Sequence, residues 1–206
     1  RLARGGFQYP PQSVAVMMNL IDSHDTIRFL TSAGSVERLM LAAMFSMSYV
    51  GMPHIWYGDE IGMTGGKDPD CRRPFDWRYE GDPRKVALRD YYGRITRLRR
   101  DTEVLRRGAF ATLATSGRGF AFARHLDGQV AITLLNAGPS PVTLDLPVDL
   151  LRDLVAGGPS QLEVVVGTDS FPRAAGEGLP AGEQLKIGSK AMTVSLPAYS
   201  GAILLN

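Results

Sequence analysis

Residues 14–30, which read VAVMMNLIDSHDTIRFL, decide how the rest of the sequence is interpreted. The stretch begins as an unbroken apolar run and turns polar over residues 22–26, with Arg28 shortly after. A continuous apolar run is typical of a strand that is buried on both faces of a parallel sheet. In parallel α/β folds, functional side chains gather at the carboxyl ends of the strands. We therefore predict a buried strand over residues 14–20 whose end carries a site.

The composition is that of an ordinary globular protein, with 206 residues, 44% hydrophobic and 21% charged. The net charge is +2 and no basic block occurs, so we expect no nucleic-acid partner. No apolar run reaches the roughly 18 residues of a membrane span. The single cysteine, Cys71, excludes an intrachain disulfide and has no metal-ligand partners at a useful spacing. We therefore expect no metal, no cofactor and no membrane contact.

The chain starts with Arg1 and reaches the predicted strand within about a dozen residues. A parallel strand needs neighbouring strands, and a complete α/β barrel needs roughly 250 residues. The sequence therefore predicts the C-terminal part of a longer protein.

A helix and a second strand are expected after the site. Apolar residues recur at helical spacing over residues 36–49, Ser35 is a suitable N-cap, and Gly51 and Pro53 end the helix. The β-prone residues 54–57 follow. The order strand, helix, strand predicts a right-handed βαβ unit.

A loop of about 20 residues, 62–82, comes next, and loops of this length in compact domains are usually functional. A second helix is predicted from Pro83, because proline suits the first turn of a helix. Its C-terminal arginines, Arg97, Arg99 and Arg100, suit the helix dipole. We interpret them as a solvated face.

The pattern changes after residue 107 to short strand-like segments separated by glycine and proline. Asp127 and Gly128 form a hairpin signal between two of these segments. The pattern predicts an antiparallel β-sandwich. We therefore expect a boundary near residue 107, with the α/β part in residues 1–107 and an all-β domain in residues 108–206.

Asp25 and its neighbour His24 are the first candidates for chemistry. Ser23, His24 and Asp25 suggest a hydrolytic triad, but adjacent side chains on an extended chain point to opposite sides and cannot form one. Two hydrogen-bonding groups directed at a polyhydroxyl ligand suit the residues better. The alternative is a loop carboxylate that is satisfied by backbone amides.

Three motifs carry a resemblance to a known family. MNLIDSHDTIRFL resembles the fourth conserved region of the α-amylase family, glycoside hydrolase family 13, where a His-Asp pair ends the seventh strand of a (β/α)8 barrel. GMPHIWYGDEIG is similar to that family's eighth strand. GGKDPDCRRP resembles the loop of the cyclomaltodextrinase, neopullulanase and maltogenic amylase branch. The β-rich residues would then be the family's domain C.

The resemblance implies a role for each matching residue. Asp25 would be the third catalytic carboxylate, which stabilises the transition state, and His24 would contact the same sugar. Asp68 and Arg72 would bind a glucose further toward the non-reducing end, although a loop-fixing ion pair is the alternative. Tyr57 and Glu60 are interpreted as structural.

The implied activity is retaining hydrolysis of α-1,4 glucosidic bonds, with α-1,6 as a second candidate linkage, in maltodextrins or cyclodextrins. Such enzymes need a nucleophile and an acid/base about 5 to 5.5 Å apart. In this family both lie before the seventh strand, so the fragment alone is expected to be inactive. The alternatives are transglycosylation, or a non-catalytic sugar-binding or structural member of the same fold. The resemblance also implies, as expectations, a homodimer and a cytoplasmic location.

Overall fold

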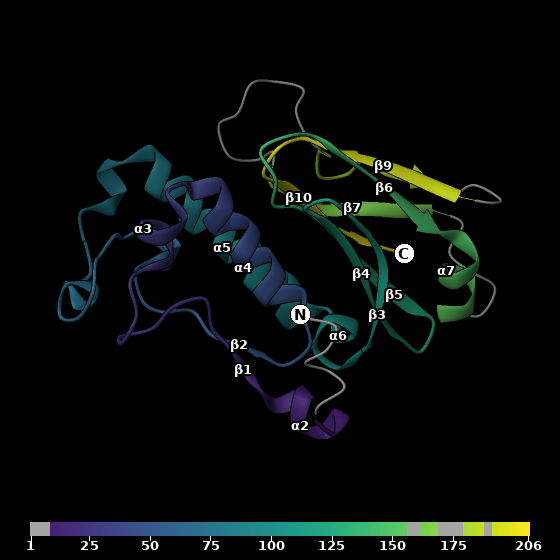
Figure 1. Cartoon of the computed structure of the whole chain (residues 1–206), viewed down its shortest axis with the longest axis horizontal. Helices are drawn as coiled ribbons and strands as arrows, with labels where there is room; N and C mark the ends of the chain where they lie inside the picture. Colours follow the sequence, from purple (N-terminus) through teal and green to yellow (C-terminus); the bar gives the residue numbers. More distant parts are fainter. Residues whose placement is uncertain (1–8, 156–160, 169–178, 188–190) are drawn as a thin grey trace.

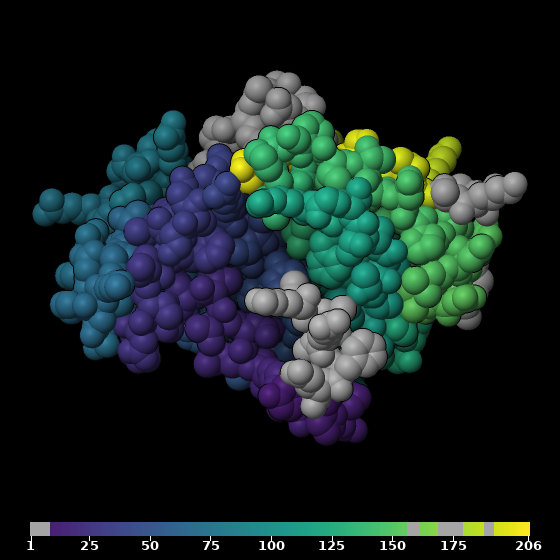
Figure 2. Space-filling model, in the orientation of Figure 1, coloured from purple at the N-terminus to yellow at the C-terminus, as the bar shows by residue number. Residues whose placement is uncertain are grey.

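A computed structural model describes residues 9–155, 161–168, 179–187 and 191–206. Three layers are stacked in it (Figure 1). The loops of the predicted site lie on one side, helices α4 and α5 lie in the middle, and two antiparallel sheets lie on the other side. Figure 2 shows the purple and blue N-terminal part of the chain packed beside the green part that follows it.

The α/β part contains α2 (Pro11–Val16), β1 (Met18–Asn19), α3 (Phe29–Ala33), α4 (Val36–Ser48), β2 (Met52–Pro53), η1 (Asp59–Ile61), η2 (Asp70–Arg72), η3 (Tyr79–Gly81), α5 (Pro83–Asp101) and α6 (Glu103–Arg107). The β-rich part contains β3 (Ala109–Ser116), β4 (Gly119–Leu126), β5 (Gln129–Asn136), β6 (Val142–Pro147), α7 (Val148–Leu154), β7 (Gln161–Gly167), β8 (Gln184–Lys186), β9 (Ala191–Leu196) and β10 (Ser200–Leu205). No helix among the described residues is both long and apolar enough to cross a membrane.

The strand predicted over residues 14–20 is wrong in its extent. Residues 11–16 form helix α2, which Pro11 begins, and only Met18 and Asn19 are β. The apolar side chains are not buried on two faces, because Val16 is 72% exposed and Met18 is 52% exposed. Among the described residues, the β1 strand pairs with β2 alone. Because no second strand among those described lies beside β1, the apolar side chains of residues 14–16 are not buried in a sheet, and the helix that Pro11 favours forms there.

The order strand, helix, strand is confirmed at this reduced size. The β1 and β2 strands are parallel, with Met18 opposite Met52. Ser35 caps α4 by accepting a hydrogen bond from the Arg38 amide, as expected. The position predicted for the second strand is wrong, because β2 comprises residues 52–53 and residues 54–57 follow it without strand structure. The His54 amide donates to the Asn19 carbonyl, so the pairing continues to the first of these residues.

The antiparallel sheet predicted after residue 107 is present. Six strands lie in the order β3-β4-β5-β10-β7-β8, and β6 and β9 form a second, two-stranded sheet. Asp127 and Gly128 connect β4 to β5 with positive φ angles of 46° and 84°, as the hairpin signal predicts. The two sheets enclose one apolar cluster, which includes Ile132, Leu144 and Leu204.

Helices α4 and α5 cover the opposite face of the six-stranded sheet. Side chains alternate along a strand, so Ala121 and Ala123 face the sandwich core while Phe122 faces the helices. Phe122 shares a buried cluster with Leu39 and Met44 of α4. The strands begin directly after α6, but the helices and the sheet share this cluster. The boundary at residue 107 therefore stays a prediction.

Two buried arginines bind the C-terminal end of α4. Arg99 donates to the carbonyls of Met47, Tyr49 and Gly51 at 2.6–3.1 Å, so its predicted solvated position is wrong. Arg124 of β4 donates to Ser48 and Tyr49 from the other side. The last carbonyls of a helix have no partner within the helix, and these two guanidinium groups supply it.

Arg124 is the better position for a stability test, because it also donates to Leu105 and Gly108. We expect Arg124→Met to lower the free energy of unfolding by about 2–4 kcal/mol, because several buried carbonyls lose a charged donor. Urea denaturation followed by circular dichroism would measure this change. The exposed Arg118 provides the control, and Arg118→Met should change stability by no more than about 0.5 kcal/mol. Equal effects of the two substitutions would contradict the role of Arg124.

Candidate functional site

The residues after β1 form a compact turn and not an extended end. The Thr26 amide donates to the Ser23 carbonyl at 3.3 Å, and the Ser23 amide donates to the Thr26 hydroxyl at 2.9 Å. His24 and Asp25 therefore do not point to opposite sides, and His24 Nε2 lies 3.2 Å from Asp25 Oδ2. The expectation from extended geometry is wrong. The triad is still unsupported, because the Ser23 hydroxyl accepts from the Asp25 amide.

The four predicted site residues come together through Arg72. Its Nη2 lies 3.3 Å from Asp25 Oδ1, and its Nε lies 2.9 Å from Asp68 Oδ1. The same Nε donates to the His24 carbonyl at 3.0 Å. Residues that lie more than 40 positions apart in the sequence thus form one continuous polar surface. The Asp68–Arg72 ion pair, which is the alternative to a glucose-binding role, exists, and Arg72 also reaches Asp25.

The loop that presents Arg72 is held by its own contacts. Asp70 accepts the Gly66 amide at 2.6 Å and pairs with Arg73 at 2.7 and 2.9 Å. The Gly66 amide and the Arg73 guanidinium hold the pKa of the Asp70 carboxyl below its usual range. The Gly65 amide donates to the Thr31 hydroxyl at 2.9 Å, which ties the loop to α3. The Asp68–Pro69 peptide is cis.

Arg28 lies beneath this surface and was not among the predicted site residues. It is fully buried and donates to the Cys71 carbonyl at 3.0 Å and to the Tyr57 carbonyl at 2.7 Å. Its Nη1 lies 3.5 Å from Asp59 Oδ1. The guanidinium also lies 4.8 Å from the Tyr57 ring centroid. Arg28 thus joins the turn, the loop and the segment after β2.

Asp59 has the most perturbed carboxyl of this region. Burial and the neighbouring Asp22 carboxyl together raise its pKa to about 8, against the opposing effect of Arg28. The sequence offered one signal for this cluster, because Asp22 and Arg28 flank the His-Asp pair at the end of an apolar run. Nothing in the sequence indicated that Asp59 would lie against them.

Other interpretations of single residues are also resolved by contacts. Glu60 accepts the Gly58 amide at 2.7 Å and Tyr57 donates to the Arg73 carbonyl at 2.8 Å, so both have structural contacts, as expected. The Trp56 ring is half-buried and lies 5.7 Å from the His24 ring. The buried Cys71 thiol donates to the His24 carbonyl at 3.1 Å. The loop that carries Cys71 thus supports the backbone of the turn.

The exposure of the four side chains decides what they can do. His24, Asp25, Arg72 and Asp68 are 56%, 67%, 47% and 53% exposed. Exposed ion pairs contribute only about 0–1 kcal/mol each, so a ligand can replace these contacts at little cost. Two carboxylates, an imidazole and a guanidinium can accept and donate hydrogen bonds to several hydroxyl groups.

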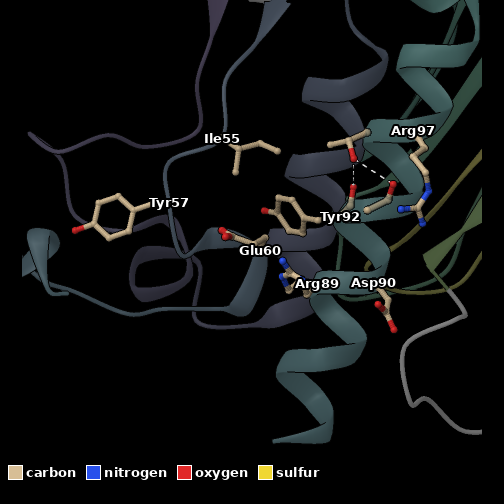
Figure 3. A pocket seen from close by; sticks show the side chains of 9 residues that line it. Ile55, Tyr57, Glu60, Arg89, Asp90, Tyr92 and Arg97 are labelled. Atoms are coloured by element: carbon tan, nitrogen blue, oxygen red, sulfur yellow. Dashed lines mark hydrogen bonds between the residues drawn. The ribbon is translucent and has the colours of Figure 1, made fainter. Parts of the chain in front are cut away.

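A surface pocket of about 480 Å³ lies elsewhere, between the segment after β2 and α5. Figure 3 shows Tyr57, Glu60 and Tyr92 around it, and none of the four predicted site residues lines it. Across the described ranges, no group of three or more histidine, cysteine or acidic residues is arranged to hold a metal ion. The turn and the loop therefore remain the candidate site.

Comparison with known proteins identifies the family. Residues 8–106 match the alpha-amylase catalytic domain. The cyclomaltodextrinase of Thermoanaerobacter pseudethanolicus is 48% identical over 122 residues, 59% of this chain and 21% of that protein. The chain belongs to the α-amylase family. Neopullulanase 2 of Thermoactinomyces vulgaris is 36% identical over 209 residues, and the match covers 100% of this chain and 32% of that protein.

Solved structures of α-amylase-family enzymes agree with this family assignment. The native debranching enzyme of Nostoc punctiforme aligns with a TM-score of 0.79 at 28% identity, covering 100% of this chain and 38% of that chain. A cyclomaltodextrinase structure aligns with a TM-score of 0.72 at 30% identity, covering 95% of this chain and 30% of that chain. The chain spans about a fifth of the length of the cyclomaltodextrinase and about a third of the length of the neopullulanase.

The loop geometry of this α-amylase-family chain can be tested at Gly65. A Cβ there would lie 2.7 Å from the Asp70 carbonyl oxygen and 2.9 Å from the Cys71 Cα. Both are backbone atoms, so Gly65→Ala should displace the loop and cost about 1–3 kcal/mol of unfolding free energy. Denaturant titration would measure it. Gly81→Ala is the control, since its Cβ meets nothing within 4 Å. An unchanged Gly65→Ala protein would show that the loop tolerates displacement.

Proposed function

We propose that this chain is the C-terminal part of a retaining glycoside hydrolase that acts on α-1,4 or α-1,6 glucosidic bonds of maltodextrins or cyclodextrins. The observation that carries the proposal is the convergence of His24, Asp25, Asp68 and Arg72 on one exposed surface. The related cyclomaltodextrinase and neopullulanase support this substrate class.

Asp25 is assigned to the transition state. Glycoside hydrolysis passes through a transition state that resembles an oxocarbenium ion. A carboxylate next to the reacting sugar stabilises positive charge and accepts hydroxyl hydrogen bonds, and both interactions strengthen as charge develops. His24 lies 3.2 Å from this carboxylate and would bind the same sugar. Arg72 and Asp68 would hold the next sugar.

The reacting carboxylates are assigned to a part of the protein outside these 206 residues. Retaining hydrolysis needs a nucleophile and an acid/base about 5–5.5 Å apart. The resemblance assigns neither role to a residue of this chain. We therefore propose that the chain alone binds sugar weakly and does not hydrolyse it.

Asp25→Asn in the intact protein tests the assignment directly. The amide keeps the size of the side chain but removes its negative charge, so the rate constant kcat should fall about 100-fold or more. Cyclodextrin hydrolysis under saturating substrate would measure it. Asp127→Asn is the matched control, because Asp127 lies in the exposed β4–β5 turn and should leave kcat unchanged. Full turnover by the Asp25→Asn protein would reject the role given to Asp25.

Arg72 separates a binding role from a loop-fixing role. If Arg72 binds substrate, Arg72→Ala should lower kcat/KM by about tenfold or more, a loss of roughly 1.4 kcal/mol of transition-state binding. The free energy of unfolding should change by less than about 1 kcal/mol, because the ion pairs are exposed. Parallel kinetic and denaturation measurements would show which quantity changes. Lost stability with unchanged kcat/KM would favour the loop-fixing alternative.

A non-catalytic sugar-binding protein is the competing outcome of these tests. It would bind cyclodextrin in a titration experiment and show no turnover in the unsubstituted intact protein. The Asp25→Asn comparison would then have no basal rate to lower. An assay of the unsubstituted protein therefore comes first.

A further inference from the structure

Two buried carboxyl groups lie together beneath the site. Asp22 and Asp59 are each 2% exposed. Asp22 Oδ2 accepts the Phe29 amide at 2.7 Å, and Asp59 Oδ1 lies 3.5 Å from Arg28 Nη1. The remaining oxygens, Asp22 Oδ1 and Asp59 Oδ2, have no donor among the described groups. The Asp59 carboxyl is, however, within hydrogen-bonding reach of the Asp22 carboxyl.

A hydrogen bond between two carboxyl groups needs a proton on one of them, because ionised carboxylates only accept. Leaving two buried acceptors without a donor costs free energy, and one shared proton satisfies both. An adjoining cavity of about 10 Å³ is at the lower limit for a single water. Its lining includes Asp59 but not Asp22, so a water there would not serve Asp22 Oδ1.

The charges around Asp22 and Asp59 also favour one shared proton. Arg28 provides a buried cation, while Glu60 adds a further acidic group near Asp59. Tyr92 reaches the cluster from α5, and its hydroxyl is buried without a partner. His54, from the segment after β2, lines the same small cavity as Asp59. Two ionised aspartates against one arginine would leave an uncompensated buried negative charge, whereas one shared proton leaves the group neutral.

We infer that Asp22 and Asp59 share one proton in the folded protein, and that this pair, held by Arg28, positions the turn that carries His24 and Asp25. The pair fixes both ends of the turn. Asp22 precedes His24 and binds the Phe29 amide beyond the turn. Arg28 follows Asp25, and its own amide donates to the Gly65 carbonyl at 3.1 Å. Asp22, Asp59 and Arg28 are thus positioning residues for the proposed function.

The first consequence is a pH dependence of stability. Burial and the Asp22 carboxyl raise the pKa of Asp59 to about 8, whereas the pKa of an aspartate in the unfolded chain lies near its ordinary value of 3.8. The folded protein therefore binds one proton more than the unfolded chain between these values. The unfolding equilibrium constant should rise about tenfold per pH unit over this window, and the stability from the pair is lost as pH passes 8.

Asp59→Asn removes the titration but keeps a donor for Asp22, because the amide NH2 replaces the carboxyl proton. Chemical denaturation of the 206-residue protein from pH 4.5 to 8.5 should show that Asp59→Asn loses the slope and remains folded. Asp59→Ala should be destabilised at every pH. Asp127→Asn, in the exposed turn, should keep the original slope. An unchanged slope in the Asp59→Asn protein, or equal destabilisation by asparagine and alanine, would overturn the inference.

Carbon-13 NMR of labelled aspartates measures the protonation state of each carboxyl group without any substitution. At pH 6.5 one carboxyl signal should have the shift of a protonated acid and should titrate near pH 8, and the backbone amide signals of Phe29 and His24 should move over the same pH range. If every aspartate is ionised at pH 6.5, the shared proton is absent. If the carboxyl titrates while Phe29 and His24 do not respond, the positioning role is rejected. Neither readout needs turnover, so failure of the proposed hydrolase function would be seen separately.

Discussion

The C-terminal end of α4 is the constraint on which the arrangement of the chain depends. Its last carbonyls face the interior, where water cannot satisfy them, and Arg99 and Arg124 bind them from α5 and β4. The cost of burying these guanidinium groups is visible in Arg124, whose pKa burial lowers to about 10 with help from Arg99. Because these contacts fix residues 47–51, they also fix where β2 begins. The segment after β2, which supplies Asp59, then lies against the turn after β1.

Charged groups in this protein fall into two environments with different consequences. Arg28, Arg99 and Arg124 are buried and donate mainly to backbone carbonyls, so removing any one would leave several buried acceptors unsatisfied. The charges of the candidate site are about half exposed and pair with one another. Such pairs add little stability. The scaffold thus depends on the buried arginines, while the exposed groups can exchange their partners for ligand hydroxyls.

Much of this arrangement could be predicted where the signal was local. The Ser35 cap, the apolar stripe of α4 and the Asp127–Gly128 turn each depend on a few neighbouring residues, and each appears as expected. The strand prediction over residues 14–20 failed because burial on two faces needs neighbouring strands, and in the part of the chain that the structure describes β1 pairs only with β2. Arg99 was misplaced because periodicity locates a helix face but not the carbonyls opposite it. The motifs indicated His24, Asp25, Asp68 and Arg72, whereas the support from Asp59 comes from tertiary packing.

The buried residues beneath the site therefore determine where the exposed residues lie, and the exposed residues do not determine the buried arrangement. Arg72 reaches Asp25 from a loop that is fixed by the contact between Asp70 and Gly66. The exposed Arg72–Asp25 ion pair is too weak to determine the position of Asp25. The position of Asp25 is determined below, where Asp22 holds the Phe29 amide and Arg28 holds the Tyr57 and Cys71 carbonyls. A ligand that displaces Arg72 from Asp25 would leave those buried bonds intact. The carboxylate would then keep its orientation while its partner changes, which is the preorganisation that the role proposed for Asp25 requires.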